Sequence, residues 1–526
     1  MLRFLVLGVL AALSLVAVLA AAIGGWGWLL LAAFVVALLV LGVYDLVQRK
    51  HSILRNYPVV GHMRYLLESI RPEMQQYFIE RNYDGRPFDR DTRSAIYQRA
   101  KGIKEEQPYG TERDLDEIGY EYLLHSTVPV DPAPEPPRVR IGGPDCTQPY
   151  DMALLNVSAM SFGSLSARAI EALNRGAAMG GFAHDTGEGA ISPYHRNGGD
   201  LVWEIGSGYF GARTKDGGFD EQEFAAKAAD DQVKMVSLKL SQGAKPGIGG
   251  VLPGAKVTQE IADTRGIPVG EKCVSPAYHQ VFSTPRELVR FLARFRELAG
   301  GKPVGFKLCV GSRVDVLAIC KAMVEEGITP DFIVVDGAEG GTGAAPLEYE
   351  DHVGMPLTEG LMTVHNALVG VGLRDRIRIG ASGKVSSGVD VVKRILQGAD
   401  YTNAARAMMQ AVGCIQSQRC HTNHCPVGVA TQDPKRMRAL DVPSKSERVF
   451  NYQKAVVEQA AQVVASMGLS SFEELRPHML RRRVDHQTIL GYDEIFDHLS
   501  PGQLYTSPPP TWVRDWELAD PDRFRP

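Results

Sequence analysis

The chain has 526 residues, 44% of them hydrophobic, which is enough for one large globular domain with additional segments. The formal net charge is −4 and no long basic run occurs, so the charge pattern argues against nucleic acid as a partner. The seven cysteines are odd in number and mostly scattered, which argues against a secreted disulfide framework and favours a reducing compartment.

The N-terminal region, residues 1–47, contains two apolar runs, 4–23 and 29–44, separated by "GGWGW". Each run with its flanks has about 20 residues, roughly the length that crosses a ~30 Å hydrocarbon core. Gly24 and Gly25 provide a turn, so the simplest interpretation is a transmembrane hairpin. The alternative is that residues 1–22 are a cleaved signal peptide.

Basic residues flank the predicted hairpin at both ends. Arg3 precedes it, and Arg49, Lys50 and Arg55 follow it. Positive charge marks the cytoplasmic side of a membrane segment. We therefore expect an inner-membrane protein whose catalytic domain lies in the cytoplasm.

Residues 48–140 are predicted to form a polar, mostly helical connector with an extended end. Apolar residues recur at helical spacing in "RYLLESIRPEMQQYFIERN", at Tyr65, Leu66, Ile70, Met74, Tyr77 and Phe78. The proline-rich stretch 130–145 marks a boundary. No internal repeat is visible.

Short β-rich runs then alternate with helical runs, which indicates a parallel sheet. Roughly eight strand–helix units between residues 141 and 435, without a strong dinucleotide fingerprint, favour an α/β fold of the (β/α)8 TIM-barrel type. A doubly wound sheet is the alternative. The candidate strands are 154–160, 180–185, 233–240, 304–310, 332–337, 376–382 and 399–403.

In a barrel of this kind the chemistry lies where strands end, so we examined the residues after each strand. "SFGSLS" after the first strand is a small, hydroxyl-bearing loop that lets a flat ligand approach the backbone. Glu188 follows the second strand between two glycines, which favours an inward-pointing acid over a solvated one. Lys239 and Lys245 bracket a polar turn, where they would stabilise a reduced flavin or else be solvated.

Two late segments are typical of a phosphate site. Gly383 and Lys384 precede a predicted helix, and Arg406 follows the last predicted strand. Backbone N–H groups and a guanidinium at these positions would suit a phosphate group. Barrels commonly hold phosphate at the loops after their seventh and eighth strands.

Three cysteines, Cys414, Cys420 and Cys425, lie close together with the spacing C-x5-C-x4-C, and Pro426 follows. Zinc would need a further ligand such as His421 or His424, and the two-residue spacing of zinc ribbons is absent. Three thiolates suit an iron–sulfur cluster better, with either three irons or four. Three buried structural cysteines are the remaining alternative.

The tail, residues 436–526, is predicted to pack as helices and to end extended. Residues 451–468 have the pattern of an amphipathic helix. The proline-rich stretch 500–516 is expected to be extended along the surface.

Several of these motifs together resemble the flavin and iron–sulfur domain of the glutamate synthase family. They are "SAMSFGSLS", "TGEGA", "KLSQGAKPG", "GGTGAAP" and "GCIQSQRCHTNHCPVGVATQDP", which occur in the family's order over about residues 150–435. "RNYPVVGHMRYLLESIRPEMQQYF" resembles the stand-alone, membrane-anchored members.

The resemblance implies a barrel that binds FMN and a [3Fe–4S] cluster and reduces 2-iminoglutarate, formed from 2-oxoglutarate and ammonia, to L-glutamate. It implies that Glu188 and Lys245 are catalytic, that Lys239 and Arg265 bind the oxoacid carboxylates, and that the three cysteines hold the cluster. The implied FMN contacts are Met160, Ser161, Glu204, Gln242, Lys245, Gly340, Gly341, Gly383, Lys384 and Arg406.

The chain also departs from the large assimilatory enzymes of that family. Val251 and Glu204 stand where those enzymes have glutamine, and Ala405–Arg406 stands where they have a glycine–threonine pair. An amidotransferase domain and a pyridine-nucleotide module are not found, so we expect free ammonia or a partner that supplies it, and an electron donor such as ferredoxin or a membrane redox protein. The oligomeric state is left open, a homo-oligomer included.

Two further hypotheses follow from these departures. The same fold could act on another amine or 2-oxoacid, as an N-methylglutamate synthase-like enzyme, and Val251 favours this because it removes a polar contact to the substrate. A non-catalytic membrane redox scaffold is the other, but the presence of Glu188, Lys239 and Arg265 counts against it.

Overall fold

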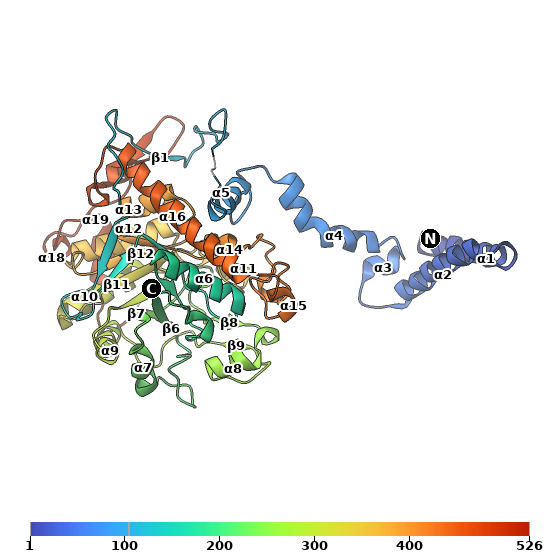
Figure 1. Ribbon diagram of the computed structural model, residues 1–526, viewed down its shortest axis with the longest axis horizontal. Helices are drawn as coiled ribbons and strands as arrows, with labels where there is room; N and C mark the ends of the chain where they lie inside the picture. The colour runs from blue at the N-terminus through green and yellow to red at the C-terminus, as the bar shows by residue number, and fades with distance from the viewer. Residues whose placement is uncertain (1, 104–105, 525–526) are drawn as a thin grey trace. The chain divides into compact units, whose positions relative to one another are not determined.

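The computed structural model describes residues 2–103 and 106–524 and divides the chain into two compact units, residues 1–90 and residues 91–526 (Figure 1). Each unit is considered by itself below. The predicted division into segments 1–47, 48–140, 141–435 and 436–526 stays a prediction, although the helical part of the connector ends with α5 (Arg90–Ala100).

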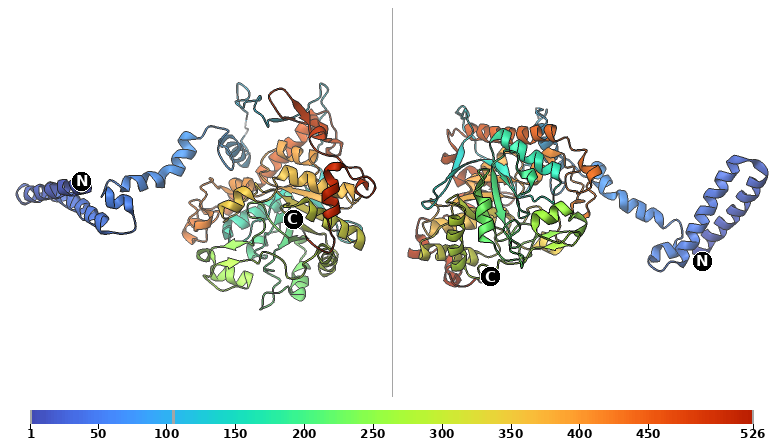
Figure 2. Two further views of the ribbon diagram at one scale, coloured as in Figure 1. Left: turned by 180° about the vertical axis from the view of Figure 1, so that it is seen from behind. Right: turned by 60° about the horizontal axis from the view of Figure 1, so that its bottom comes forward.

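The first unit begins with a helical hairpin. Helices α1 (Leu2–Gly24) and α2 (Trp26–Val47) run side by side in opposite directions (Figure 2), and Gly25 joins them with a φ of +89°, which favours glycine. Their spans Phe4–Gly24 and Trp26–Val47 have mean hydropathies of 2.8 and 2.6, and most of their side chains are exposed. By length and composition, both helices could therefore cross a membrane.

Beyond the hairpin the first unit continues as short helices. These are α3 (Ser52–Asn56), α4 (His62–Met74) and a π-helical turn, η1 (Gln75–Ile79). The predicted helical spacing over this region is thus confirmed, and its apolar side chains are exposed. The three basic residues at 49, 50 and 55 are exposed too, whereas the side chain of Arg3 lies outside the described part of the chain.

The second unit is built on a closed barrel of eight parallel strands, so the predicted TIM barrel is confirmed and the doubly wound alternative is wrong. Closure comes from the pairing of the first and last strands, in which Thr402 lies opposite Leu155. In barrel order the strands are β4 (Leu155–Val157), β5 (His184–Asp185), β6 (Leu201–Ile205), β7 (Val233–Lys239), β10 (Val304–Leu308), β11 (Phe332–Asp336), β12 (Arg378–Ser382) and β13 (Tyr401–Ala404).

Helices between the strands cover the outside of the barrel, as Figure 1 shows. They are amphipathic and bury their apolar face against the strands; in α9, for example, Leu288, Leu292 and Phe295 are fully buried. The main covering helices are α6 (Ala167–Gly180), α7 (Glu221–Ala228), α9 (Pro285–Leu298), α10 (Arg313–Glu326), α12 (Leu357–Gly370), α13 (Gly388–Leu396) and α14 (Arg406–Val412).

Smaller elements sit around the barrel. A two-stranded hairpin, β8 (Val251–Leu252) with β9 (Cys273–Val274), follows β7 and encloses α8 (Gln259–Arg265). The sheet of β2 (Arg138–Ile141) and β3 (Tyr150–Ala153) precedes the first barrel strand, and β1 (Glu121–Leu123) joins β14 (Leu480–Arg483) and β15 (Ile489–Gly491). Helix α11 (Leu347–His352) lies in the loop after β11.

The C-terminal region corrects two expectations. Helix α16 (Val442–Ser466) begins nine residues earlier than predicted, because Asp441 caps it by accepting a hydrogen bond from the Ser444 amide. The stretch expected to be extended contains α18 (Gln503–Thr506) and α19 (Pro510–Leu518). Proline is compatible with the first helical turn, so the proline run starts α19 instead of preventing it. The remaining short helices are α15 (Pro434–Met437) and α17 (Tyr492–Ile495).

The polar side chain of Asn156, on β4, links the strands at which the barrel closes. Its Nδ2 donates to Ala153 O at 2.8 Å and Thr402 O at 3.4 Å, and its Oδ1 accepts from Ala183 N at 3.0 Å. All of these groups are buried, so water does not replace a lost partner.

Replacing Asn156 by Ala should therefore lower the free energy of unfolding by about 1–3 kcal/mol, the cost of leaving a buried donor and acceptor unpaired. The measurement is urea unfolding of the detergent-solubilised chain followed by circular dichroism. Asn56→Ala, at an exposed position, is the control. Equal unfolding midpoints for the two variants would contradict this role for Asn156.

Candidate active site

The carboxyl ends of the barrel strands carry nearly all of the predicted site residues. Met160 and Ser161 follow β4, Glu188 follows β5, and Glu204 lies within β6. Lys239 ends β7, and Gln242 and Lys245 lie in the loop after it. Because all strands are parallel, these positions share one rim of the barrel.

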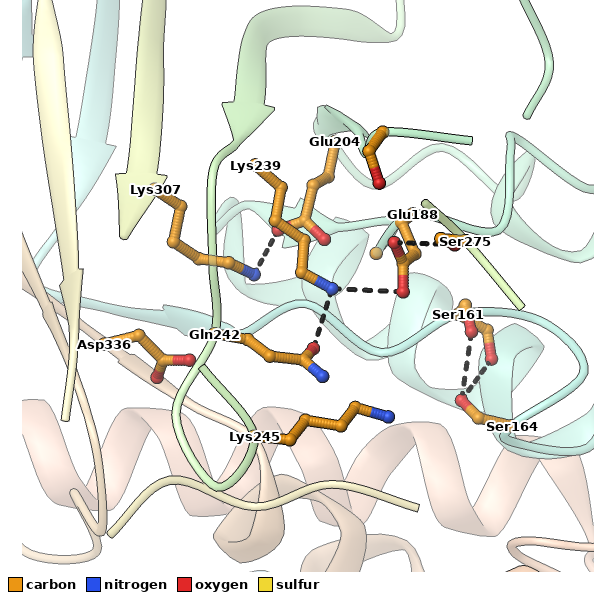
Figure 3. Close-up of polar contacts among 12 residues, drawn as sticks. Ser161, Ser164, Glu188, Glu204, Lys239, Gln242, Lys245, Ser275, Lys307 and Asp336 are labelled. Atoms are coloured by element: carbon orange, nitrogen blue, oxygen red, sulfur yellow. Dashed lines mark hydrogen bonds and ion pairs between the residues drawn. The ribbon is translucent and has the colours of Figure 1, made fainter. Parts of the chain in front are cut away.

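Lys239 and Glu188 form an ion pair at this rim. Lys239 Nζ lies 3.1 Å from Glu188 Oε1, and the two side chains are 8% and 15% exposed. Lys239 also donates to Gln242 Oε1 at 2.7 Å, and the Ser275 hydroxyl lies 3.4 Å from Glu188 Oε2 (Figure 3). The pair is thus fixed from both sides by neutral polar groups.

The charge state of Glu188 follows from its surroundings. Burial alone would raise its pKa, but Lys239 first, and then Arg265 and Lys245, lower it below the ordinary value for Glu. Gly206 and Gly250 lie so close to the carboxylate that a Cβ on either would overlap its oxygens. The absence of side chains at these two glycines is therefore what leaves room for the Glu188 carboxylate.

Lys245 and Arg265 contribute two more cations. Lys245 Nζ donates to Ala344 O at 2.9 Å, and burial lowers its pKa to about 8, with Lys239 adding to the shift. Ala244, just before it, has a φ of +63°, a strained conformation of the kind found at functional sites. Arg265 Nη2 donates to Ser161 Oγ at 3.1 Å and to Phe162 O at 2.9 Å, so it supports the loop after β4.

Inside the barrel lies a second group of charges, which the sequence analysis did not identify apart from Glu204. Lys307 on β10 forms an ion pair with Glu204 on β6, and both side chains are buried (Figure 3). Asp185 on β5 faces them: burial, and next the Glu204 charge, raises its pKa. Asp336 ends β11 and accepts a hydrogen bond from the Gly243 amide at 2.8 Å. The sequence feature that could have identified this buried group is the lysine within the apolar run "VGFKL", because a lysine is rarely buried unless it is paired.

The predicted phosphate-binding residues lie in three neighbouring loops of the same rim. Gly340 and Gly341 follow β11, Gly383 and Lys384 follow β12, and Arg406 follows β13. Arg406 Nη2 donates to Glu339 O at 2.5 Å, and a Cβ on Gly341 would lie 3.1 Å from Arg406 Cδ. The loops after β11 and β13 therefore touch through this arginine.

The helix expected to face the phosphate is α13, which starts four residues after Lys384 and caps itself. Ser387 Oγ accepts from the Asp390 amide, and Asp390 Oδ2 accepts from the Ser386 and Ser387 amides. The backbone amides of Ser386 and Ser387, just before α13, therefore already have a hydrogen-bond acceptor within the chain. The loop residues Gly383 and Lys384, with φ of +148° and +51°, remain the candidates for phosphate contact.

The three cysteines of the predicted cluster lie in the segment after α14. Cys425 is buried, and Cys414 and Cys420 pack against the same apolar core. Burial, with Cys420 and Cys425 adding to its effect, raises the pKa of Cys414 to about 12. Gln416 N donates to Cys414 Sγ at 3.4 Å, and Tyr97 Oη donates to Cys414 O at 2.7 Å.

The arrangement of possible ligands indicates which metal the cysteine segment, residues 414–425, could bind. Within residues 2–103 and 106–524, no three His, Cys, Asp or Glu side chains form a group that could hold a single metal ion. His421 and His424, the expected zinc ligands, are exposed. Each thiolate of an iron–sulfur cluster binds a different iron, so its sulfurs need not converge on one point.

Comparison with known proteins gives relatives of one kind. Residues 145–470 match the family described as the conserved region in glutamate synthase. The chain is 38% identical over 490 residues to the glutamate synthase large subunit-like protein YerD of Bacillus subtilis strain 168, covering 85% of this chain and 93% of that protein.

Other relatives are covered only in part. The archaeal-type glutamate synthase (NADPH) of Thermotoga neapolitana is 36% identical over 321 residues, which is 61% of this chain and 60% of that protein. Among solved structures, a mutant flavocytochrome b2 with pyruvate bound aligns over 84% of this chain and 91% of that chain. Its 13% identity and TM-score of 0.40 are too low to add to the assignment.

The family match covers more than half of the chain, and the match to YerD covers most of both proteins. The chain therefore belongs to the glutamate synthase family.

Proposed function

We propose that this chain is an FMN- and iron–sulfur-dependent oxidoreductase that converts 2-oxoglutarate and ammonia, through 2-iminoglutarate, to L-glutamate. The observation that carries the proposal is the charge at the rim of the barrel. Three cations, Lys239, Lys245 and Arg265, act on the one carboxylate of Glu188. The resulting excess of two positive charges complements the two carboxylates of the oxoacid.

The residues of the rim fit an FMN molecule. Gly340, Gly341 and Gly383 keep the loops free of side chains where a flat ring and a phosphate would approach, and Lys384 and Arg406 supply positive charge for the phosphate. Met160, Ser161 and Gln242 line the loops nearest the Lys239–Glu188 pair. Glu204 is held by Lys307, which lies opposite Lys239 in the pairing of β10 with β7, and would support the site from inside the barrel.

The cysteine segment fits a [3Fe–4S] cluster, held by Cys414, Cys420 and Cys425. Burial raises the pKa of Cys414 and of Cys420, so holding them as thiolates requires strong positive charge, which iron supplies. The amide of Gln416 already points at one sulfur. When bound, FMN would supply a hydride and the cluster the single electrons that restore it.

The roles of the protein groups follow from their contacts. Lys239 and Arg265 would hold the oxoacid carboxylates, and Gln242 and Glu188 would keep the Lys239 ammonium in position. Hydride addition at the imine carbon requires a proton at the imine nitrogen. Glu188, ionised and partly exposed, would take a proton from solvent and pass it to that nitrogen. Lys245 would add positive charge beside the flavin ring.

Electrons must come from outside the chain, from ferredoxin or a membrane redox protein. Helices α1 and α2 would anchor the enzyme in the cell inner membrane with the barrel in the cytoplasm, because the exposed basic residues at 49, 50 and 55 follow the hairpin. Ammonia would arrive free in solution or from a partner.

A second candidate is a related enzyme that uses another amine, such as an N-methylglutamate synthase. Val251 favours it, because this half-buried apolar residue follows Gly250, which touches the Glu188 carboxylate. An apolar group at this point tolerates a methyl group on the substrate nitrogen.

The test is turnover by the purified full-length protein with 2-oxoglutarate and a chemical reductant, with ammonium or methylamine as the amine. We expect a yellow-brown protein that contains FMN and iron and forms L-glutamate from ammonium. N-methylglutamate as the preferred product would select the second candidate. A protein that contains neither FMN nor iron would exclude both.

Replacing Glu188 by Gln should reduce turnover by about 10²–10⁴-fold while FMN stays bound, because the proton carrier is lost and the side chain keeps its size. The rate is measured with saturating oxoacid, and FMN is quantified from its visible spectrum. Glu271→Gln, at an exposed position just before β9, is the control. Loss of FMN from Glu188→Gln would refute the catalytic role and indicate a structural one.

Oxoacid binding should weaken as the pH rises through about 8. The pKa of Lys245 is lowered to about 8, so its positive charge is present below that pH and lost above it. Losing one of the three positive charges at the rim should weaken 2-oxoglutarate binding about tenfold, which isothermal titration calorimetry measures.

Lys245→Arg keeps its charge and should remove this pH dependence, whereas Lys272→Met, at an exposed lysine, should retain it. If the arginine variant loses affinity over the same pH range as the unchanged protein, Lys245 is not the group responsible.

A further inference from the structure

Lys256 is a fully buried lysine to which the proposed chemistry gives no role. It ends the short turn η3 (Gly254–Lys256) after β8, and 1% of it is exposed. In the described part of the chain no carboxylate pairs with it. Burying an ammonium without a carboxylate is costly, so its other contacts must compensate.

The amine of Lys256 joins two loops that are far apart in the sequence. It donates to Ser164 O at 2.6 Å and to Cys420 O at 3.3 Å. Ser164 belongs to the loop after β4, where Arg265 contacts Ser161 and Phe162. Lys256 thus spans from the proposed oxoacid side of the site to one of the three cysteines.

Other contacts hold the same segments together. Asn423 Nδ2 donates to Ala255 O at 3.1 Å, next to Lys256 in the chain. Gln432 Nε2 donates to Gly163 O and Leu165 O at 3.0 and 2.9 Å. Among these contacts, Lys256 is the one whose donor is an ammonium, and it contacts the backbone of a cysteine directly.

The ionisable groups that act on Lys256 are the thiols of Cys420 and Cys425 and the guanidinium of Arg265. Hydrogen bonds and positive charge near the sulfurs raise the reduction potential of an iron–sulfur cluster, because they stabilise the form with the extra electron. A buried ammonium has a stronger effect than an exposed one, because the surrounding dielectric is low.

We propose that Lys256 is a positioning residue that holds the Cys420 loop against the loop Ser161–Ser164 and raises the reduction potential of the cluster. The inference rests on the proposed function, since it requires the cluster. It adds that one positively charged side chain, Lys256, joins the loop Ser161–Ser164 to the segment that contains the three cysteines.

The experiment compares Lys256→Met, Lys256→Gln and Lys256→Arg in the full-length protein, with Lys435→Met as the control. Lys435 is exposed and lies ten residues after Cys425, so this variant removes the same charge without breaking the contact. Iron and FMN are counted per chain, and the midpoint potential of the cluster is measured by redox titration with electron paramagnetic resonance.

We expect Lys256→Met and Lys256→Gln to keep FMN and to lower the midpoint potential, with electron transfer from the donor into the cluster slowed about tenfold, as for other residues that support metal ligands. Lys256→Arg should stay close to the unchanged protein, because its guanidinium can reach the same carbonyl groups. Lys435→Met should leave both quantities unchanged.

Selective loss of iron with FMN retained in Lys256→Met would also support the positioning role. An unchanged potential, iron content and transfer rate in Lys256→Gln would overturn the inference while the proposed function stands. If Lys256→Met fails to fold, the comparison of Lys256→Gln with Lys256→Arg decides, and equal potentials overturn the inference. Absence of a cluster from the unchanged protein would overturn the proposed function and this inference together.

Discussion

The pairing of β13 with β4 is the constraint on which the candidate site depends, because it closes the sheet. In an open sheet the first and last strands would lie far apart. Closure brings the loop after β4, which contains Ser161, to the same rim as Arg406 after β13. Residues about 245 positions apart in the sequence thereby become parts of one site, as the Asn156–Thr402 contact illustrates.

Charges inside the barrel explain how the rim keeps its shape. Lys307 pairs with Glu204 across β10 and β6, and Asp336 fixes the loop after β7 through the Gly243 amide. Lys307 lies opposite Lys239 in the pairing of β10 with β7, so the first of these contacts adjoins the Lys239–Glu188 pair. Cations held in this way are preorganised, so they need not rearrange when an anionic ligand arrives.

The sequence predicted the barrel and seven of its eight strands, because buried parallel strands are short apolar runs between helical stretches. It missed β6, since Glu204 makes that run look exposed and its partner Lys307 is 103 residues away. The sequence did not reveal that Lys307 and Lys256 are buried for the same reason, because a buried charge is recognisable only when its distant partners are known. The helix α19 was missed because a proline run marks both extended chain and helix starts.

One departure from the family resemblance, Val251, lies in a part of the site that is not paired with the barrel strands. Val251 lies in the β8–β9 hairpin, whose strands pair with each other and not with barrel strands. This hairpin still reaches the centre of the site, since Gly250 touches Glu188 and Ser275 faces the same carboxylate. If the proposed function holds, a change at Val251 would therefore alter which amine or oxoacid fits without disturbing strand closure. Substrate choice and barrel stability would then be carried by different segments of the chain.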